Sequence, residues 1–288
     1  MNEKSVYFGS LARFYGNTSY ALEVISESRL AFVRVSNLND PFDPYFYFET
    51  DFGFDYKRLF EYVRVFHPND FGWFIQELPP ARWKERIATI NRYLQYTRNT
   101  TFMTCFIAPS EHMVPQNNLL MWAHYGRGHR GAMIEFDKKR LDDSIVAVNS
   151  TAETPTEHTG QVMMKVQYQD SAPIITPRDI YEFYQESRNT FPDNTKLMRK
   201  FRSFLYVKSK VWSYENEWRM LWRNDETKED TVKMFINEDT IKAIYIGMNA
   251  DHDTRNNVTI AARKTFPRST VFLAKKKHGK FGLEFEII

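Results

Sequence analysis

The sequence predicts an α+β protein with a mixed or antiparallel sheet core and helical insertions. Short segments of alternating hydrophobicity are scattered between helical segments of unequal length, without the regular strand–helix–strand spacing of a parallel doubly wound sheet. Hydrophobic residues make up 42% of the 288 residues and charged residues 26%. These values are typical of a globular protein, so they exclude collagen-like and wholly disordered chains.

The first hundred residues begin with a strand, a helix and a second strand. A short strand is expected at residues 6–8, ending near residues 11–14, and Asn17 opens a helix that reaches residue 29. Residues 30–35 alternate between two faces, as a strand does. Residues 55–100 are aromatic and helical, with breaks at their prolines near residues 67–70 and 79–80.

The rest of the chain continues this mixed pattern. Strands are expected at residues 101–106, 132–136, 162–168, 218–223, 241–246, 271–273 and 283–288, helices at 117–125 and about 180–212, and a loop at 147–160. No repeat or linker interrupts the sequence. We therefore expect one domain, residues 1–288, with the aromatic helices at about 55–100 as an insertion.

Composition narrows the function classes only slightly. The net charge of +3 is too small to indicate nucleic-acid or membrane binding by itself. The single cysteine, Cys105, excludes an intramolecular disulfide and fits a reducing compartment. No signal-peptide pattern and no stretch of about 18 apolar residues occurs, so we expect a cytoplasmic protein without a membrane partner.

The most informative motif is formed by Glu215, Glu217 and Arg219. If this stretch is extended, the three side chains share one face, because side chains alternate along a strand. Buried charges of this kind need partners, since an unpaired buried charge costs several kcal/mol. The alternative is a solvated Glu/Arg face with Trp212 and Trp218 in the core.

A tight basic turn spans residues 126–131, where three glycines alternate with Arg127, His129 and Arg130. Such a turn could seat a phosphate through backbone N–H groups and guanidinium groups, although it matches no phosphate-loop fingerprint. The alternative is a structural connection, in which the nearby His124 is satisfied by a backbone carbonyl.

Asn39 and Asp40 directly precede a proline, Pro41. Such residues often form ordinary turns. A rigid turn at the end of a strand could instead present both side chains to a ligand.

Several well-known catalytic motifs are absent from the sequence. There is no zinc-binding H-E-x-x-H or C-x-x-C motif, and no G-x-S-x-G nucleophile elbow. Cys105 lies in an apolar run, where cysteine is usually an inert small hydrophobic residue; a catalytic thiol is the alternative.

Taken together, these segments resemble the bacterial family catalogued as domain of unknown function 2971. The matching pieces run in the family's order across nearly the whole chain, at residues 12–14, 34–43, 121–125, 131–136, 166–168, 208–219 and 244–247. The family name implies no function. The long aromatic segment at about 55–100 could be peculiar to this protein.

More distantly, the order of elements is similar to that of ADP-ribosyltransferases. This resemblance implies an ADP-ribosyltransferase-like fold and NAD as the substrate. Those enzymes carry Arg or His on a first strand, Ser or Tyr on a second strand, and Glu on a later strand, often as E-x-E. By position, Arg13 corresponds to the first, Ser36 to the second, and Glu217 with Glu215 to the third.

The resemblance also implies roles for these residues. Glu217 would hydrogen-bond the ribose and stabilise developing positive charge, while Glu215 would orient or deprotonate the acceptor. Arg13, with Arg127 or Arg130, would hold the diphosphate. The other residues expected to contact NAD are polar or aromatic: Asn39, Asp40, Trp122, His124, Tyr125, Trp212 and Arg219. The acceptor would be a protein or a nucleic acid, in a toxin or phage-defence setting with a possible antitoxin partner.

Two other functions stay open from the residues alone. One is a metal-dependent phosphodiesterase or nuclease that uses Asp40, His124, Glu135, Glu215 and Glu217. The other is a non-catalytic module whose aromatic helices bind protein or single-stranded nucleic acid.

Overall fold

The computed structural model of the chain describes residues 9–38, 40–49, 52–149 and 162–288. The chain divides into two compact units. The first unit comprises Met1–Val33, Phe102–Val166 and Ser213–Ile288, and the second comprises Arg34–Thr101 and Gln167–Trp212. The aromatic helices predicted near residues 55–100 therefore share a unit with residues 167–212, and the expectation of one domain stays a prediction.

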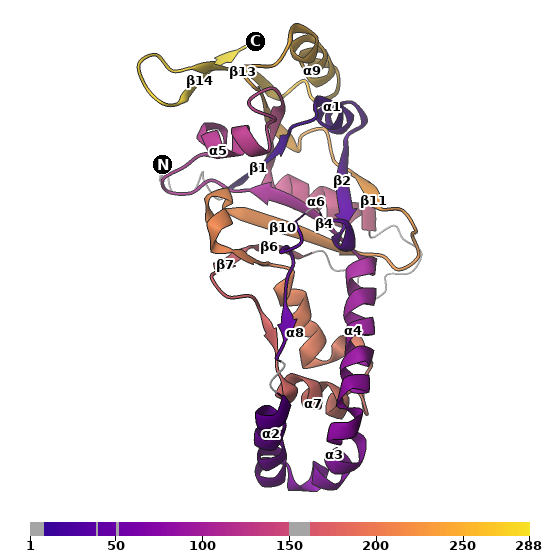
Figure 1. The fold of residues 1–288 in the computed structure, drawn as a ribbon. Coiled ribbons are helices and arrows are strands. Elements are labelled where there is room, and N and C mark those ends of the chain that lie inside the picture. The colour runs from indigo at the N-terminus through magenta and orange to yellow at the C-terminus, as the bar shows by residue number, and fades with distance from the viewer. Residues whose placement is uncertain (1–8, 39, 50–51, 150–161) are drawn as a thin grey trace. The chain divides into compact units, whose positions relative to one another are not determined.

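A ten-stranded sheet forms the first unit (Figure 1). Its strands are β1 (Ser10–Tyr15), β2 (Arg29–Arg34), β4 (Thr101–Ile107), β5 (Ala132–Asp137), β6 (Val162–Lys165), β10 (Glu217–Arg223), β11 (Thr231–Phe235), β12 (Ile241–Ile246), β13 (Thr270–Lys276) and β14 (Leu283–Ile287). The main order is β11-β2-β4-β1-β5-β12-β13-β14, and β10 pairs with β4 and β6.

Most of these strands pair antiparallel, as β1 does with β5 and β13 with β14. The pair β12–β13 is parallel, and its two strands are joined by α9 (His252–Thr265). A parallel pair needs such a crossover because its two strands run in the same direction. The expected α+β class with a mostly antiparallel sheet is confirmed, whereas the ADP-ribosyltransferase-like fold stays a prediction.

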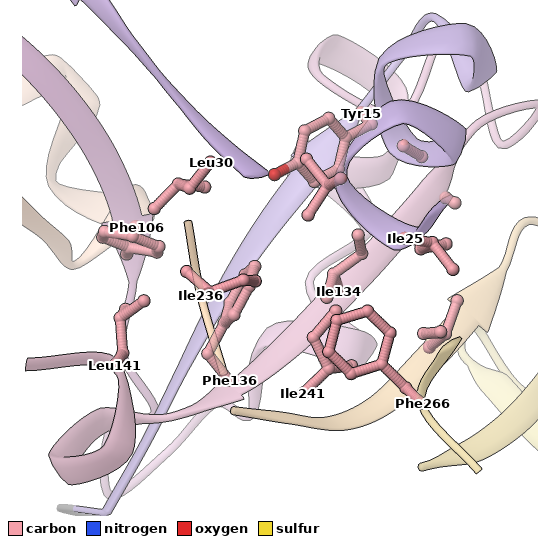
Figure 2. Packing of buried hydrophobic residues seen from close by; sticks show 14 of the residues in the cluster. Tyr15, Ile25, Leu30, Phe106, Ile134, Phe136, Leu141, Ile236, Ile241 and Phe266 are labelled. Atoms are coloured by element: carbon pink, nitrogen blue, oxygen red, sulfur yellow. The ribbon is translucent and has the colours of Figure 1, made fainter. Parts of the chain in front are cut away.

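One face of the sheet carries the larger hydrophobic cluster, which includes residues of α1 (Thr18–Glu27), α6 (Lys138–Asn149) and α9. Figure 2 shows Phe106, Ile134 and Phe136 from the strands packed with Ile25 from α1 and Phe266 from the end of α9. These five side chains are at most 1% exposed. Burying a side chain of this size contributes roughly 1.5–3 kcal/mol, so this face supplies much of the unit's stability.

The other face carries a smaller cluster with Phe14, Met133 and Tyr245, together with Trp122 from α5 (Leu119–His124). Strand β1 shows how the two clusters are separated. Its residues Leu11 and Tyr15 belong to the larger cluster, and Ala12 and Phe14 belong to the smaller one. The alternation along each strand therefore tells on which face a side chain lies.

The second unit is mainly helical. Its helices are α2 (Phe52–Phe66), α3 (Phe71–Glu77), α4 (Trp83–Thr100), α7 (Pro177–Glu186) and α8 (Lys196–Phe204), and its strand pairs are β3 (Tyr47–Phe48) with β8 (Ile174–Ile175) and β7 (Gln167–Gln169) with β9 (Val207–Ser209). Phe74 packs edge-on against Tyr181, and the Tyr184 hydroxyl donates to the backbone carbonyl of Arg86. These contacts join α3 and α4 to α7.

Most predicted elements are confirmed. Asn17 caps α1 by accepting a hydrogen bond from the Ser19 N–H at 3.1 Å. Strand β2 lies where the hydrophobic alternation places it, and β4, β5 and β12 lie at the other strand-like segments. The breaks of the aromatic helices also fall at their prolines. No helix in the described part of the chain is long and apolar enough to cross a bilayer.

Other expectations need correction. The strand expected at residues 6–8 lies outside the described residues, and the first described strand is β1. The expected loop begins inside α6, and its later residues lie outside the described part. The helical stretch expected near 180–212 is interrupted between α7 and α8 and again by β9. Helices α6 and α9 and strand β11 were not predicted from the sequence. Only Val258 and Ala262 of α9 are buried, which is too sparse a pattern to stand out.

Candidate functional site

A buried ion pair begins strand β10. The Arg219 guanidinium donates to the Glu217 carboxylate through Nε at 2.7 Å and through Nη2 at 3.3 Å. Glu217 is 4% exposed and Arg219 is 0% exposed. The prediction that these two residues share a strand face is confirmed, and the alternative of a solvated Glu/Arg face is wrong. A two-pronged, charge-assisted contact is what makes such deep burial tolerable.

Glu215 does not continue that strand. It ends a 3-10 helix, η8 (Lys210–Glu215), and the following Asn216 has a left-handed backbone with φ 44°. Asparagine adopts this conformation more readily than most residues. The Asn216 side chain fixes the turn, because its Nδ2 donates to the Ala108 carbonyl at 2.8 Å and also to that of Pro109. The expectation of three charged side chains on one extended face is therefore wrong for Glu215.

The Glu215 carboxylate is nevertheless held in place. It is 3% exposed and accepts a hydrogen bond of 2.6 Å from the hydroxyl of Tyr125, which directly follows α5 and is 38% exposed. Asn118 caps α5 through its Oδ1 and donates from Nδ2 to the Tyr214 carbonyl at 2.9 Å. Two hydrogen bonds thus connect the residues that flank α5 with η8. The exposed His124 ring lies 6.4 Å from the Tyr214 ring.

A pocket with a volume of about 480 Å³ opens beside this turn. Its wall combines the end of β4, the following loop, the start of α5, the residues on both sides of Glu215, and the tip of the β13–β14 hairpin. The lining residues are Ile107, Ala108, Ser110, Met113, Pro115, Asn117, Asn118, Leu119, Leu120, Ser213, Tyr214, Asn216 and Phe281. The pocket mixes apolar surface with amide and hydroxyl groups, as small-molecule sites do.

Arg13 lies on the other face of the sheet. Its guanidinium donates to the Ala31 carbonyl at 3.1 Å and to the Thr104 hydroxyl. On β4, Thr104 shares a face with Phe102, whose ring contacts that of Trp222.

On β10, Met220 belongs to the larger cluster, and Trp222 shares its face because side chains alternate along a strand. Glu217 and Arg219 therefore lie on the opposite face. The structure therefore does not bring Arg13 to the Glu217 site. Its expected role in holding the diphosphate, with Arg127 or Arg130, stays a prediction. In the structure, Arg13 anchors neighbouring strands.

Trp122 is a core residue. Its side chain is 0% exposed, its Nε1–H donates to the Gln116 carbonyl at 2.8 Å, and its ring packs edge-on against Phe14 and stacks on His129. A ligand ring cannot stack on a side chain enclosed in this way. The expected contact between Trp122 and NAD is therefore corrected.

The basic turn after Tyr125 is a structural connection. The backbone N–H groups of residues 128–131 donate to the carbonyls of Ala123, Trp122 and Gly126, so they are not available as a phosphate cradle. A Cβ atom on Gly131 would lie 2.0 Å from the Tyr15 carbonyl oxygen, which explains the glycine there. The side chains of Arg127 and Arg130 are exposed on this turn.

The remaining expected residues belong to the second unit. Asp40 and Trp212 line one pocket of about 360 Å³, together with aromatic residues Phe42 and Tyr45. Ser36 is exposed in the short 3-10 helix η3 (Val35–Asn37), and Asn39 lies outside the described residues. Whether Ser36 acts with Glu217 stays a prediction.

The structure gives no support to the metal-dependent hypothesis. Among the described residues, no group of three or more His, Cys, Asp or Glu side chains could hold a metal ion. Glu135 instead accepts hydrogen bonds from the hydroxyls of Ser10 and Tyr245. The Lys242 ammonium lies 3.9 Å from the same carboxylate.

Sequence reasoning missed the residues that build the turn, namely Asn118, Asn216 and Tyr214. One signal was present for Asn216, because asparagine is among the residues that tolerate a left-handed turn. Asn118 stands directly before an apolar helical segment, which is a typical cap position. No local pattern indicated that Tyr214 would line a pocket.

Residues 121–220 match the family described as Protein of unknown function (DUF2971). No curated protein and no solved structure matches the chain. Tyr125, Glu215, Glu217 and Arg219 all fall inside the matched segment, whereas Arg13 and Ser36 fall outside it. The two ends of the matched segment meet at the Tyr125–Glu215 hydrogen bond. This chain therefore carries, over residues 121–220, the sequence pattern of that family of unknown function, and the carboxylate turn lies within it.

Proposed function

We propose that this chain is an NAD-dependent ADP-ribosyltransferase whose working residues are Glu215 and Glu217. The observation that carries the proposal is their setting. Two carboxylates, 3% and 4% exposed, flank one fixed turn, and the residues on both sides of Glu215 wall a pocket of about 480 Å³. Sites for small molecules have volumes of roughly 300–1,000 Å³, so the pocket can hold a large part of a dinucleotide.

The chemistry of the transfer suits these groups. The bond between the nicotinamide nitrogen and the ribose breaks, its electron pair leaves with nicotinamide, and positive charge develops on the ribose. The Glu217 carboxylate, oriented by Arg219, supplies fixed negative charge in a low-dielectric setting. The Glu215 carboxylate, which accepts from Tyr125, takes the proton that the acceptor loses when it bonds to the ribose. Arg13 has no part in this scheme, because its guanidinium lies on the opposite sheet face.

A second candidate is a non-catalytic binding module. The observation that favours it is the burial of the Glu217–Arg219 pair, since exposures of 4% and 0% also suit a purely structural pair that holds the turn. In that case the pocket binds its ligand without bond cleavage, and neither carboxylate is needed for more than folding.

Calorimetry with NAD and a nicotinamide-release assay separate the two candidates. We expect NAD to bind the wild-type protein, and Glu217→Gln to slow nicotinamide release by about 10²–10⁴-fold, because a general acid–base or charge-stabilising carboxylate contributes on that order. Tyr125→Phe removes one hydrogen bond to Glu215 and should slow release by roughly tenfold, the equivalent of about 1.4 kcal/mol.

Glu238→Gln is the matched control, since this glutamate is exposed and belongs to the same unit. It should release nicotinamide like the wild type. Thermal unfolding of each variant shows that it is folded. A wild-type protein that neither binds nor consumes NAD contradicts the transferase and favours the binding module. Undiminished release by folded Glu217→Gln removes this residue from the mechanism.

A further inference from the structure

The β13–β14 hairpin carries a cluster of lysines that the small net charge of the whole chain does not reveal. The chain has a net charge of only +3, yet Lys275, Lys276, Lys277 and Lys280 all lie within six residues and all are exposed. Two acidic residues, Glu284 and Glu286, stand on the returning strand, and Glu286 pairs with Lys275. The three lysines nearest the tip, Lys276, Lys277 and Lys280, therefore form a local cationic surface.

Backbone hydrogen bonds define the shape of the tip. The Lys277 N–H donates to the Gly282 carbonyl at 3.0 Å, and the Lys280 N–H closes a turn onto the Lys277 carbonyl. Gly279 has φ +66°, a conformation that a glycine adopts without strain. Figure 1 shows the hairpin (yellow) extending from the sheet of its unit. The turn therefore holds the lysines and Phe281 together in solvent.

Phe281 is as exposed as it would be in an extended chain, at 104%. It is also one of the residues that line the 480 Å³ pocket, with Tyr214 elsewhere in the same wall. An exposed phenylalanine contributes nothing to the core, and beside a pocket and among lysines its ring is accessible for stacking on a base. The pocket also offers hydroxyl and amide groups from Ser110, Ser213 and Asn117.

A strand of unpaired nucleotides fits this combination. Its phosphates pair with lysine ammonium groups, its bases stack on aromatic side chains, and a splayed base can enter a polar pocket. A membrane surface matches the lysines but would leave the concave pocket unused, because interfacial binding depends on an apolar face laid along the bilayer.

We propose that the β13–β14 hairpin binds single-stranded nucleic acid, with Lys276, Lys277 and Lys280 on the phosphates and Phe281 stacked on a base at the mouth of the pocket. This binding is independent of NAD. If the transferase proposal holds, the nucleic acid is the acceptor class of the same site.

Fluorescence anisotropy with a labelled 20-nucleotide oligo(dT), in the absence of NAD, tests the proposal. We expect binding that weakens as NaCl rises from 50 to 200 mM, because phosphate contacts release counterions. The triple variant Lys276→Ala/Lys277→Ala/Lys280→Ala should lower the slope of log affinity against log salt by about 2, at about 0.7 per phosphate contact. Phe281→Ala should weaken binding by roughly 5- to 100-fold.

Two matched controls test whether the effects are specific to the hairpin. One controls for the loss of positive charge, and the other controls for the loss of an exposed phenylalanine. Lys84→Ala/Lys139→Ala/Lys228→Ala removes the same charge from exposed positions outside the hairpin, and Phe191→Ala removes a phenylalanine that is 81% exposed in the second unit. Both controls should bind like the wild type.

Equal binding by the hairpin triple variant and its control overturns the proposal, as does a wild-type protein that does not bind the oligonucleotide. Binding to vesicles of anionic phospholipid with no binding to oligo(dT) overturns it in favour of a membrane surface. The transferase proposal is judged separately, by NAD binding and nicotinamide release.

Discussion

Each face of the large sheet carries an arginine, and the two arginines differ in their hydrogen-bond partners. Arg13, on the face of the larger hydrophobic cluster, donates to the neutral oxygens of Ala31 and Thr104 and lies over the Tyr15 ring. Arg219, on the opposite face, is completely buried and pairs with Glu217. The difference shows that a conspicuous charged residue on a first strand can be structural. It also shows that the Glu217 carboxylate of the proposed site lies on the face opposite Arg13.

The largest effect is expected from Arg219→Met, which keeps the volume of the side chain but leaves Glu217 without its guanidinium. The free energy of unfolding, measured by urea denaturation, should fall by about 3–5 kcal/mol, because removing one partner of a buried ion pair leaves the other charge buried without compensation. The double variant Glu217→Gln/Arg219→Met should recover most of this loss. If Arg219→Met is as stable as the wild type, the ion pair does not offset the cost of burying the Glu217 carboxylate.

A smaller effect is expected from Arg13→Met on the other face. It removes charge-assisted hydrogen bonds to the neutral groups Ala31 and Thr104, so the free energy of unfolding should fall by roughly 1.5–3 kcal/mol. Nicotinamide release by the folded variant should not change. Loss of release without loss of stability would return Arg13 to the site and refute the separation of the two faces.

The smallest effect concerns two tyrosines, one for each face. Burial raises the pKa of Tyr15 above its ordinary value of 10.0, with Arg13 acting in the opposite direction. Burial also raises the pKa of Tyr245 above 10.0, and there the neighbouring Glu135 carboxylate acts in the same direction. In both cases the folded protein retains a proton that the unfolded chain loses.

The stability from these two phenols is therefore fully present below pH 10 and is lost as the pH rises above 10 towards the folded-state pKa. Tyr245→Phe should make the decline of unfolding free energy above pH 10 shallower, by at most about 1.4 kcal/mol per pH unit. Tyr15→Phe should have a smaller effect, since Arg13 opposes the shift. Parallel curves for the wild type and Tyr245→Phe would show that the phenol is not perturbed.

The sequence predicted much of the fold from local rules. Alternation predicted β2, apolar strand-like segments predicted β5 and β12, a cap residue predicted the start of α1, and prolines predicted the breaks in the aromatic helices. Where local patterns were weak, prediction failed. Charged residues interrupt the apolar spacing of α6 and α9, and their buried side chains became evident only when packed against the sheet.

For the candidate site, the sequence correctly paired Glu217 with Arg219 on one strand face but extended the same strand through Glu215. A left-handed backbone at Asn216 lies between them, and it is stabilised by the carbonyls of Ala108 and Pro109, more than 100 residues away. Such a turn depends on partners from a distant segment, so the motif alone could not indicate it.

By itself, the sequence determined the class of fold, the start of several elements, and the presence of two glutamates and an arginine close together in the chain. Those properties follow from residue spacing and local backbone preferences. Only the tertiary structure decided which sheet face each charge occupies, that Tyr125 reaches Glu215 across 90 residues, and that Phe281 borders the pocket lined by Tyr214 and Asn216. Burial and hydrogen-bond partners are properties of packed segments, and no single segment contains them.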